Sequence, residues 1–286
     1  MKGEPALRLF AVLGHPIAHS LSPRLHQAAL DSLGVAAAYL AIDVEPSRLP
    51  DTLRSLHEME AHGLSVTAPL KRVAYESAVR VTDEARVSGV ANCLRREAAG
   101  YVATNTDGEG FVAFARDVGV RLEGARVVLL GGGGSAAGLY PALARAGAAC
   151  LVVARDRERA QALPGLAAAP WAMWDSPEAR KGIGEAHLVI NATTLGGAPA
   201  DPLPCDPAWL APGAVAVDLR YAPRRTPWLV LASARGVRAF DGLGLLVHQG
   251  ALSLRFWLDV EPRLDRLREF VGWKPLPLGV DGSVEE

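Results

Sequence analysis

Two residues of this 286-residue chain could together move a proton: Lys71, in the segment SVTAPLK, and Asp107, in TNTDGEGF. Lys71 is expected in the first turn of a helix, where the helix dipole opposes a cation and eases proton exchange near neutrality. A carboxylate such as that of Asp107 would hold the ammonium in place and tune its basicity. Taken alone, each residue has a simpler interpretation, Lys71 as a surface lysine and Asp107 as the N-cap of the following helix.

A loop rich in hydroxyl groups, HSLSP, follows an expected strand and precedes an expected helix. Its two serines, Ser20 and Ser22, could bind a carboxylate or a polyol, and the helix amides nearby favour an anion. Ordinary capping of the helix by Ser22 is the alternative. The histidines in and around this loop do not have a recognised metal-ligand spacing, so we expect no metal site.

A glycine-rich turn follows an apolar segment near the middle of the chain, in RVVLLGGGGSAAG. Gly131, Gly133 and Ala136 fit the dinucleotide-binding pattern G-x-G-x-x-G/A. The first glycine permits a tight turn, the second lets a pyrophosphate approach the backbone, and the small third residue lets the helix pack closely. The turn therefore predicts a bound dinucleotide.

The identity of that dinucleotide is read about 20 residues further on, at the end of the next strand. There the segment VVARDRERA carries Arg155, Arg157 and Arg159. Guanidinium groups suit the 2′-phosphate of NADP, whereas the acid Asp156 is compatible with NAD. A solvated helix start with paired charges is the alternative interpretation. NADP is favoured.

Composition narrows the class of protein. Thirty basic and 31 acidic residues give a net charge of −1, without a basic stripe, which argues against nucleic acid or an anionic membrane as partner. No apolar run approaches the ~18 residues of a membrane span, and the N-terminus does not resemble a signal peptide. Three widely spaced cysteines suit reduced thiols in the cytoplasm.

The elements that must position these residues alternate between strands and helices. We expect strands at residues 8–14, 39–44 and 63–67, with helices at 26–35, 48–60 and from about 70. A helix at 110–118 leads to a second series, in which strands at 127–131, 150–155, 187–193 and 214–221 alternate with a helix at 139–147. Helices at 246–258 and 260–273 complete the chain. This order predicts an α/β fold with mostly parallel sheets and helical crossovers.

Eight segments together resemble the shikimate dehydrogenase family. They are GHPIAHSLSPRLH, SVTAPLK, SGVANCL, TNTDGEGF, LGGGGSAAG, INATTLG, DLRYAPRRTP and DGLGLLVHQGA, and the likeness as a whole covers nearly all of the chain, from about Phe10 to Trp257. Their order and spacing are far more specific than any one of them. The resemblance implies an NADP-dependent oxidoreductase that reversibly reduces 3-dehydroshikimate to shikimate, a step toward the aromatic amino acids.

The resemblance also implies residue roles. Lys71 would pass the proton to or from the 3-oxygen, assisted by Asp107, while the nicotinamide exchanges a hydride with C3. The implied substrate-binding residues are Ser20, Ser22, Thr67, Asn92, Tyr221 and Gln249. The implied cofactor-binding residues are Gly131, Gly132, Gly133, Gly134, Ser135, Ala154, Arg155, Asp156, Arg159, Leu219 and Gly242.

The same resemblance implies a two-domain organisation. An N-terminal α/β substrate-binding domain would span residues 1–109 and be completed by 241–275, a Rossmann-like NADP-binding domain would span 110–240, and 276–286 would be a frayed tail. We expect a monomer or a homodimer that acts on a small molecule.

Several residues depart from the family pattern. Ser65 stands where the family usually has asparagine, Cys93 replaces a threonine, and Leu245 replaces a common methionine. Ala154 and Asp156 alter the usual Asn-Arg-Thr segment. These departures leave open whether the chain prefers quinate or another hydroxylated ring acid, and how strictly it selects NADP. A non-catalytic NADP-binding protein is a third hypothesis.

Overall fold

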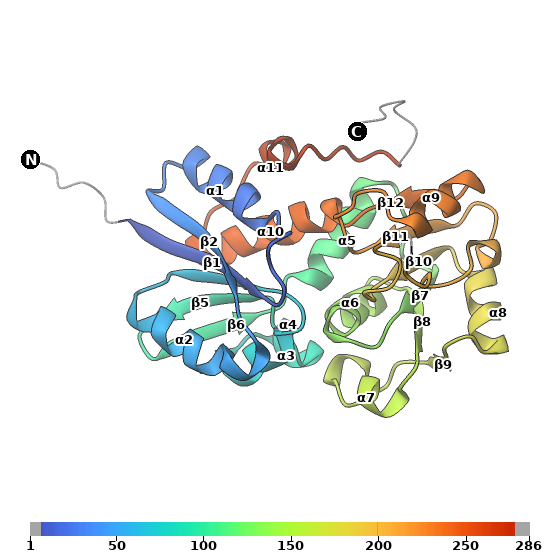
Figure 1. The fold of residues 1–286 in the computed structure, drawn as a ribbon, viewed down its shortest axis with the longest axis horizontal. Coiled ribbons are helices and arrows are strands. Elements are labelled where there is room, and N and C mark those ends of the chain that lie inside the picture. Colours follow the sequence, from blue (N-terminus) through green and yellow to red (C-terminus); the bar gives the residue numbers. More distant parts are fainter. Residues whose placement is uncertain (1–6, 199, 278–286) are drawn as a thin grey trace, which may run out of the picture. The chain divides into compact units, whose positions relative to one another are not determined.

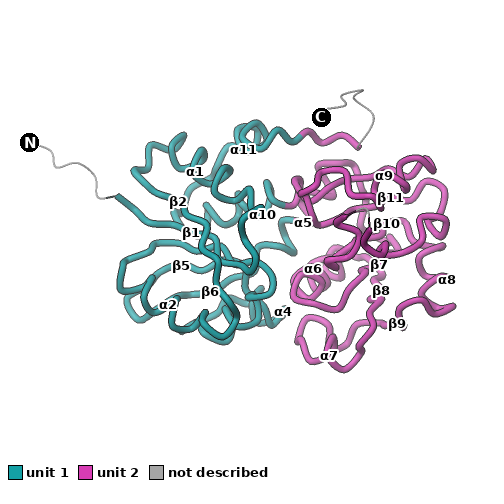
Figure 2. Tube along the Cα trace, in the orientation of Figure 1, with its two compact units in different colours: residues 1–110, 246–273 teal, residues 111–245, 274–286 magenta. Residues whose placement is uncertain are grey.

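The computed structural model describes residues 7–198 and 200–277. The chain divides into two compact units, shown in different colours in Figure 2. Unit 1 comprises residues 1–110 and 246–273, and unit 2 comprises residues 111–245 and 274–286. The chain passes from one unit to the other within the helices α5 (Asp107–Asp117) and α10 (Leu243–Leu258), and again after Trp273.

Unit 1 contains a six-stranded sheet with the strand order β2-β1-β3-β5-β6-β4. Its strands are β1 (Arg8–Gly14), β2 (Ala37–Asp43), β3 (Gly63–Val66), β4 (Arg80–Val81), β5 (Cys93–Glu97) and β6 (Gly100–Thr104). Strand β5 is antiparallel to both β3 and β6, and the other pairs are parallel. The carboxyl ends of β1, β3 and β6 therefore meet at one edge of the sheet, together with the start of β5.

Helices cover both faces of this sheet (Figure 1). They are α1 (Ser22–Ser32), α2 (Leu49–Glu58), α3 (Lys71–Glu76), α4 (Asp83–Ser88), α11 (Leu264–Val271) and the short η1 (Pro46–Arg48), with α10 returning from unit 2. Alternation along β1 explains the two layers, because successive side chains point to opposite faces. Ala11 and Leu13 pack in the aliphatic cluster that includes Leu49 and Leu53 of α2. Phe10 instead contacts the Trp257 ring of α10, at 5.4 Å between ring centroids.

Unit 2 contains a fully parallel six-stranded sheet with the order β12-β11-β10-β7-β8-β9. Its strands are β7 (Arg126–Leu130), β8 (Ala149–Ala154), β9 (Trp171–Met173), β10 (Leu188–Asn191), β11 (Val215–Asp218) and β12 (Arg238–Phe240). The chain builds β7, β8 and β9 outward on one side and then returns to add β10, β11 and β12 on the other. The strand order therefore reverses between β7 and β10, the point at which such sheets bind nucleotides.

The strands of unit 2 read as nearly continuous apolar runs because helices bury both faces of a parallel sheet. These helices are α6 (Gly134–Arg145), α7 (Arg157–Gln161), α8 (Pro177–Glu185) and α9 (Pro227–Ala234), with short turns at η2 (Pro164–Leu166) and η3 (Pro207–Trp209). Trp228 of α9 is fully buried and joins the core with Val189 and Ala216 from the central strands.

The α/β fold class expected from the sequence is confirmed, and the expected strands and helices are present with small shifts at their ends. Helix α10 begins at Leu243, three residues before the prediction. The antiparallel β5–β6 pair was not expected. Most of the expected frayed tail, residues 278–286, lies outside the described residues. Within the described part of the chain, every helix is too short or too polar to cross a membrane.

Candidate active site

Lys71 and Asp107 form a buried ion pair in unit 1. Lys71 is the first residue of α3, which follows the loop after β3, and Asp107 is the first residue of α5, after β6. Lys71 Nζ donates to Asp107 Oδ2 at 2.5 Å, and the two residues are 9% and 5% exposed. Asp107 is thus more than a cap of α5, because its carboxylate binds side chains brought from other elements.

Two side-chain amides adjoin the ion pair. Asn92 Nδ2 donates to Asp107 Oδ1 at 2.7 Å and lies 3.3 Å from Gln249 Oε1. Asn92 Oδ1 accepts a hydrogen bond from the backbone N–H of Thr106 at 2.8 Å. Gln249 Nε2 donates to the carbonyl of Leu246, one turn earlier in α10. The predicted residues Lys71, Asp107, Asn92 and Gln249 are therefore joined in one hydrogen-bonded network.

Three further residues complete this network and were not singled out from the sequence. Asn105 Oδ1 accepts from the N–H of Asp107 at 3.0 Å, which fixes the start of α5. Thr106 Oγ1 lies 3.3 Å from Ser253 Oγ. Asn105 and Thr106 directly precede Asp107 in the tripeptide NTD, so their adjacency was the available signal. Ser253, four residues after Gln249 on α10, could have been found from helical spacing.

Ser20, Ser22 and Thr67 lie in the loops at the same edge of the sheet, because β1 and β3 are parallel neighbours. Thr67 N–H donates to the carbonyl of Leu13 at 2.9 Å. The alternative interpretation of Ser22, as the cap of α1, is wrong: the N-cap residue is Leu21, and Ser22 is the first helical residue. Its N–H donates instead to Ser20 Oγ at 3.2 Å.

Unit 1 thus gathers an ammonium, a carboxylate, two amides and several hydroxyls at one edge of its sheet. The lysine can exchange a proton with a bound oxygen, and the amides and hydroxyls can bind hydroxyl or carboxylate groups. No group of three or more histidine, cysteine, aspartate or glutamate side chains in the described residues could hold a metal ion.

The glycine turn after β7 has the geometry of a nucleotide cradle. Gly131 has φ +112°, and a Cβ there would lie 2.9 Å from Thr193 Cγ2. A Cβ on Gly132 would lie 2.6 Å from the Cβ of Ala160, whereas a Cβ on Gly133 would meet only open space. Helix α6 begins at Gly134 without a side-chain cap, so its first amides face the turn. These features fit a pyrophosphate at the helix N-terminus.

The residues expected to read the nucleotide follow β8, which ends at Ala154. Asp156 is the N-cap of α7, and its Oδ1 accepts from the N–H of Arg159 at 2.9 Å. Arg157 donates from Nε to Gln161 Oε1 at 3.1 Å. Among the described residues, the exposed side chains of Arg155 and Arg159 have no hydrogen-bond or ion-pair partner. Two guanidinium groups therefore remain available for a 2′-phosphate, and the unit fits NADP.

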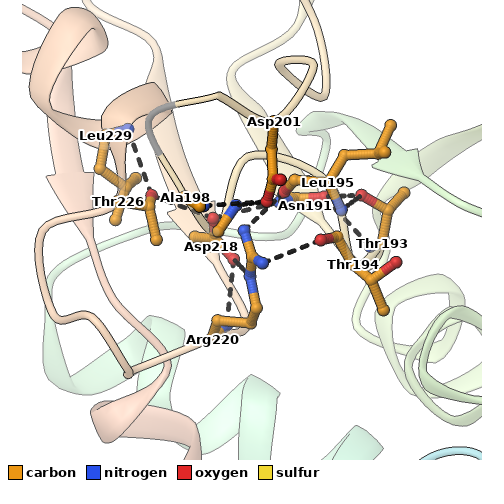
Figure 3. A network of polar contacts seen from close by, with 11 residues as sticks. Asn191, Thr193, Thr194, Leu195, Ala198, Asp201, Asp218, Arg220, Thr226 and Leu229 are labelled. Atoms are coloured by element: carbon orange, nitrogen blue, oxygen red, sulfur yellow. Dashed lines mark hydrogen bonds and ion pairs between the residues drawn. The ribbon is translucent and has the colours of Figure 1, made fainter.

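A second polar network lies at the carboxyl ends of β10 and β11 (Figure 3). Asn191 Nδ2 and Thr226 Oγ1 both donate to Asp218 Oδ2, each at 3.1 Å. Burial raises the pKa of Asp218, and the N–H and guanidinium of Arg220 oppose that rise. The predicted cofactor residues Leu219 and Gly242 adjoin this network. Tyr221, the next residue after Arg220, belongs to unit 2, whereas the other predicted substrate residues belong to unit 1.

Two of the departures from the family pattern lie on adjacent strands of unit 1. Ser65 Oγ accepts a hydrogen bond from Tyr39 Oη at 2.8 Å. Cys93 pairs with Ser65 across β3 and β5, and burial raises the pKa of its thiol to about 12. Cys93 is thus a protonated core residue, and Ser65 is engaged by an aromatic neighbour.

A glycine turn at the switch point of a parallel sheet, together with a buried lysine–aspartate pair in a second α/β unit, defines a protein of the nucleotide-dependent dehydrogenase class. Residues 12–94 match the model of the shikimate dehydrogenase substrate binding domain. The chain is 40% identical over 262 residues to the shikimate dehydrogenase (NADP(+)) of Acidiphilium cryptum, covering 90% of this chain and 93% of that protein. This chain belongs to the shikimate dehydrogenase family.

Solved structures agree with this assignment. The shikimate 5-dehydrogenase of Thermus thermophilus, solved with NADP(H) and shikimate, has a TM-score of 0.83 and 34% identity, with 93% of this chain and 98% of that chain covered. The shikimate dehydrogenase of Aquifex aeolicus has a TM-score of 0.85 and 27% identity, with 93% and 97% covered.

Proposed function

We propose that this chain catalyses the reversible NADP-dependent reduction of 3-dehydroshikimate to shikimate. Membership of the shikimate dehydrogenase family supports the activity, and the buried Lys71–Asp107 pair is the single observation that carries the mechanism. Unit 1 would bind the ring acid and unit 2 the nucleotide, as expected for the domains at 1–109 with 241–275 and at 110–240. NADPH, when bound, supplies the hydride to C3 of the ring.

The residues of unit 1 would supply the proton that the reduction needs and hold its donor in place. As C3 becomes tetrahedral, its oxygen gains negative charge, and Lys71 Nζ donates a proton to it, so that the carbonyl becomes a hydroxyl. Asp107 holds Nζ in place and stabilises the ammonium before the transfer. In the oxidative direction, Lys71 accepts the same proton.

The other polar residues at this edge of the unit 1 sheet would orient the substrate ring. Asn92 and Gln249 present amide groups to ring hydroxyls, and Thr67 presents a hydroxyl. Ser20 and Ser22 would bind the ring carboxylate beside the first turn of α1, where the helix dipole favours an anion. Such a fixed arrangement places the substrate oxygen within reach of Lys71 and lowers the entropic cost of the reaction.

NADPH formation at 340 nm with purified protein, NADP and shikimate tests the proposal. We expect turnover by the wild type and a fall in kcat of about 10²- to 10⁴-fold in Lys71→Met, the usual contribution of a positioned general acid. Asp107→Asn should fall in the same direction. Lys181→Met, which removes an exposed lysine from α8, is the matched control and should leave kcat unchanged.

Quinate and NAD belong in the same assay. Quinate, or another hydroxylated ring acid, is the second candidate substrate, because Ser65, which accepts from Tyr39, stands where the family usually has asparagine. Turnover on quinate with none on shikimate would refute the proposed substrate. NADP binding without turnover on any ring acid would refute the enzyme altogether and leave a non-catalytic NADP-binding protein.

We also infer a cytoplasmic enzyme that is a monomer or a homodimer. Cys93, Cys150 and Cys205 are free and buried, which is consistent with a reducing compartment. Light scattering on the purified protein would distinguish the two oligomeric states.

A further inference from the structure

Arg220 joins three segments of unit 2 at the carboxyl edge of its sheet (Figure 3). Its Nη1 donates to the carbonyl of Thr194 at 2.9 Å, and its Nη2 donates to that of Leu195 at 2.5 Å, both in the loop after β10. Its own N–H donates to Asp218 Oδ1 at 3.0 Å, at the end of β11. Its carbonyl accepts from the N–H of Gly242 at 2.8 Å, just before α10.

The loop after β10 is built around this guanidinium. A Cβ placed on Gly197 would collide with Arg220 Nη1. Gly197 does not have a left-handed φ, so a side chain there is opposed by the guanidinium, which would have to move, and not by the backbone conformation. The N–H groups of Gly197 and Ala198 donate to Asp201 Oδ2 at 2.9 and 2.8 Å, which closes the loop on itself.

The beginning of the same loop is fixed by buried side chains. Thr193 Oγ1 donates to Asn191 Oδ1 at 2.6 Å and accepts from the N–H of Leu195 at 3.0 Å. Asn191 in turn donates to Asp218, which is fully buried. Asn191 therefore fixes the first residues of the loop, and Arg220 fixes the next ones to the end of β11.

The position of this loop connects it to the nucleotide. β10 and β7 are parallel neighbours, and the strand order reverses between them. The loop after β10 thus lies beside the glycine turn after β7, and a Cβ on Gly131 would meet both Ala192 O and Thr193 Cγ2. Nucleotides bind at this switch point, outside the carboxyl ends of the strands. The glycine turn therefore forms one side of the expected nucleotide-binding site, and the loop held by Arg220 forms the other side.

We propose that Arg220 is a positioning residue for the dinucleotide, whose guanidinium sets the affinity for the nucleotide by holding the 192–198 loop beside the glycine turn. The proposal rests on the proposed function, since NADP is the nucleotide concerned. A guanidinium is suited to this task because its planar fork donates to two carbonyls at once, which a lysine ammonium on a flexible stem does not reproduce.

The first test compares two arginines of unit 2 whose side chains each donate to backbone carbonyls outside the sheet, Arg220 in the loop after β10 and Arg126 at the end of α8. Arg220→Ala should raise the Kd for NADP, measured by titration calorimetry, by about tenfold, because the freed loop must then be ordered on binding at a cost similar to that of one lost charged hydrogen bond. Hydrogen exchange of the 192–198 amides should become faster. Arg126→Ala is the control, because Arg126 donates to Glu185 O at the opposite edge of the sheet, and its Kd should stay within twofold of wild type.

The second test is a double-mutant cycle. Gly197→Ala should displace the guanidinium and raise the Kd for NADP about as much as Arg220→Ala does. In the Arg220→Ala background the same substitution should change the Kd by less than about twofold, because the collision is gone. Gly184→Ala is the control glycine, since its Cβ would meet only Trp209 O, at an ordinary 3.6 Å.

The outcomes separate the two proposals. A Kd for NADP that Arg220→Ala leaves within twofold of wild type, even with faster exchange in the loop, would show a merely structural arginine and overturn the inference. Equal effects of Gly197→Ala in both backgrounds would also overturn it. A wild-type chain without affinity for NADP would refute the proposed function, and the inference with it.

Discussion

His26 is a buried histidine whose titration should contribute to the acid sensitivity of the protein. It lies on α1, fully buried, with its ring stacked on Tyr39 at 4.8 Å and tilted against Trp257 at 5.0 Å. In the described residues, neither ring nitrogen has a hydrogen-bond partner. Burial therefore lowers the pKa of His26 from 6.5 to about 3, because the charged ring would lose its hydration without gaining a partner.

The sign and size of the effect follow from these two pKa values. Below pH 6.5 the unfolded chain binds a proton at His26 and the folded chain does not, so falling pH favours unfolding. The free energy of unfolding drops by about 1.4 kcal/mol for each pH unit between 6.5 and 3. Between pH 8 and pH 5, His26 alone should remove about 2 kcal/mol.

His26→Phe isolates this contribution, since phenylalanine keeps a flat ring against Tyr39 but cannot titrate. Urea unfolding of both proteins at pH 8 and pH 5, followed by tryptophan fluorescence, gives the change of each with pH. The other ionisable groups are common to both proteins, so the variant should lose about 2 kcal/mol less than the wild type on acidification. Equal losses, or an NMR titration of His26 near pH 6 in the folded protein, would refute the reasoning.

Three further predictions concern polar side chains that either are exposed or form a hydrogen bond with another side chain. Replacing Arg155 and Arg159 together by alanine should raise the KM for NADP at least about tenfold and leave that for NAD unchanged, as steady-state kinetics with both nucleotides would show. Ser65→Ala should alter the ratio of kcat/KM for shikimate to that for quinate, whereas an unchanged ratio would mean that the Tyr39 contact is remote from the substrate. The hydrogen bond that the His15 ring donates to the Asp43 carboxylate raises the pKa of His15, so the stability that this pair adds is complete below pH 6.5 and is lost as pH rises through the raised value. The thermal stabilities of wild type and His15→Gln should therefore converge at alkaline pH, in low salt.

The expected strands were largely correct because burial leaves a strong mark on parallel strands. The segments RVVLL, ACLVVA, LVIN and VAVD of unit 2 are short apolar runs between turn residues, and all four are strands. The β5–β6 hairpin was missed because three consecutive charged residues, Arg95 to Glu97, interrupt the segment CLRREAAGYVAT. Its strands are partly solvated where Arg95, Arg96 and Glu97 lie, so the alternation of a half-buried strand is lost.

Some residues of the candidate site could likewise be predicted from the local sequence, and others could not. Lys71 and Asp107 each begin a helix shortly after a strand, and Asn92 directly precedes one, so local sequence brings all three to the edge where parallel strands end together. Arg220 is also polar and follows a strand, yet nothing local shows that its side chain reaches back to the loop after β10. That contact joins residues 25 or more positions apart, and it depends on Gly197 being small enough to admit a guanidinium.

Asp156 shows why cofactor selectivity cannot be read from one acid in the sequence. An aspartate after the second strand of such a unit suggests a bond to the ribose 2′-hydroxyl and thus NAD. Here the carboxylate caps α7 by accepting the N–H of Arg159, which uses one of its oxygens and holds the acid at the helix start. The same bond fixes the backbone of Arg159, whose side chain is left without a protein partner in the part of the chain that the structure describes. The acid therefore helps to present an arginine, and the segment favours the 2′-phosphate of NADP despite its aspartate.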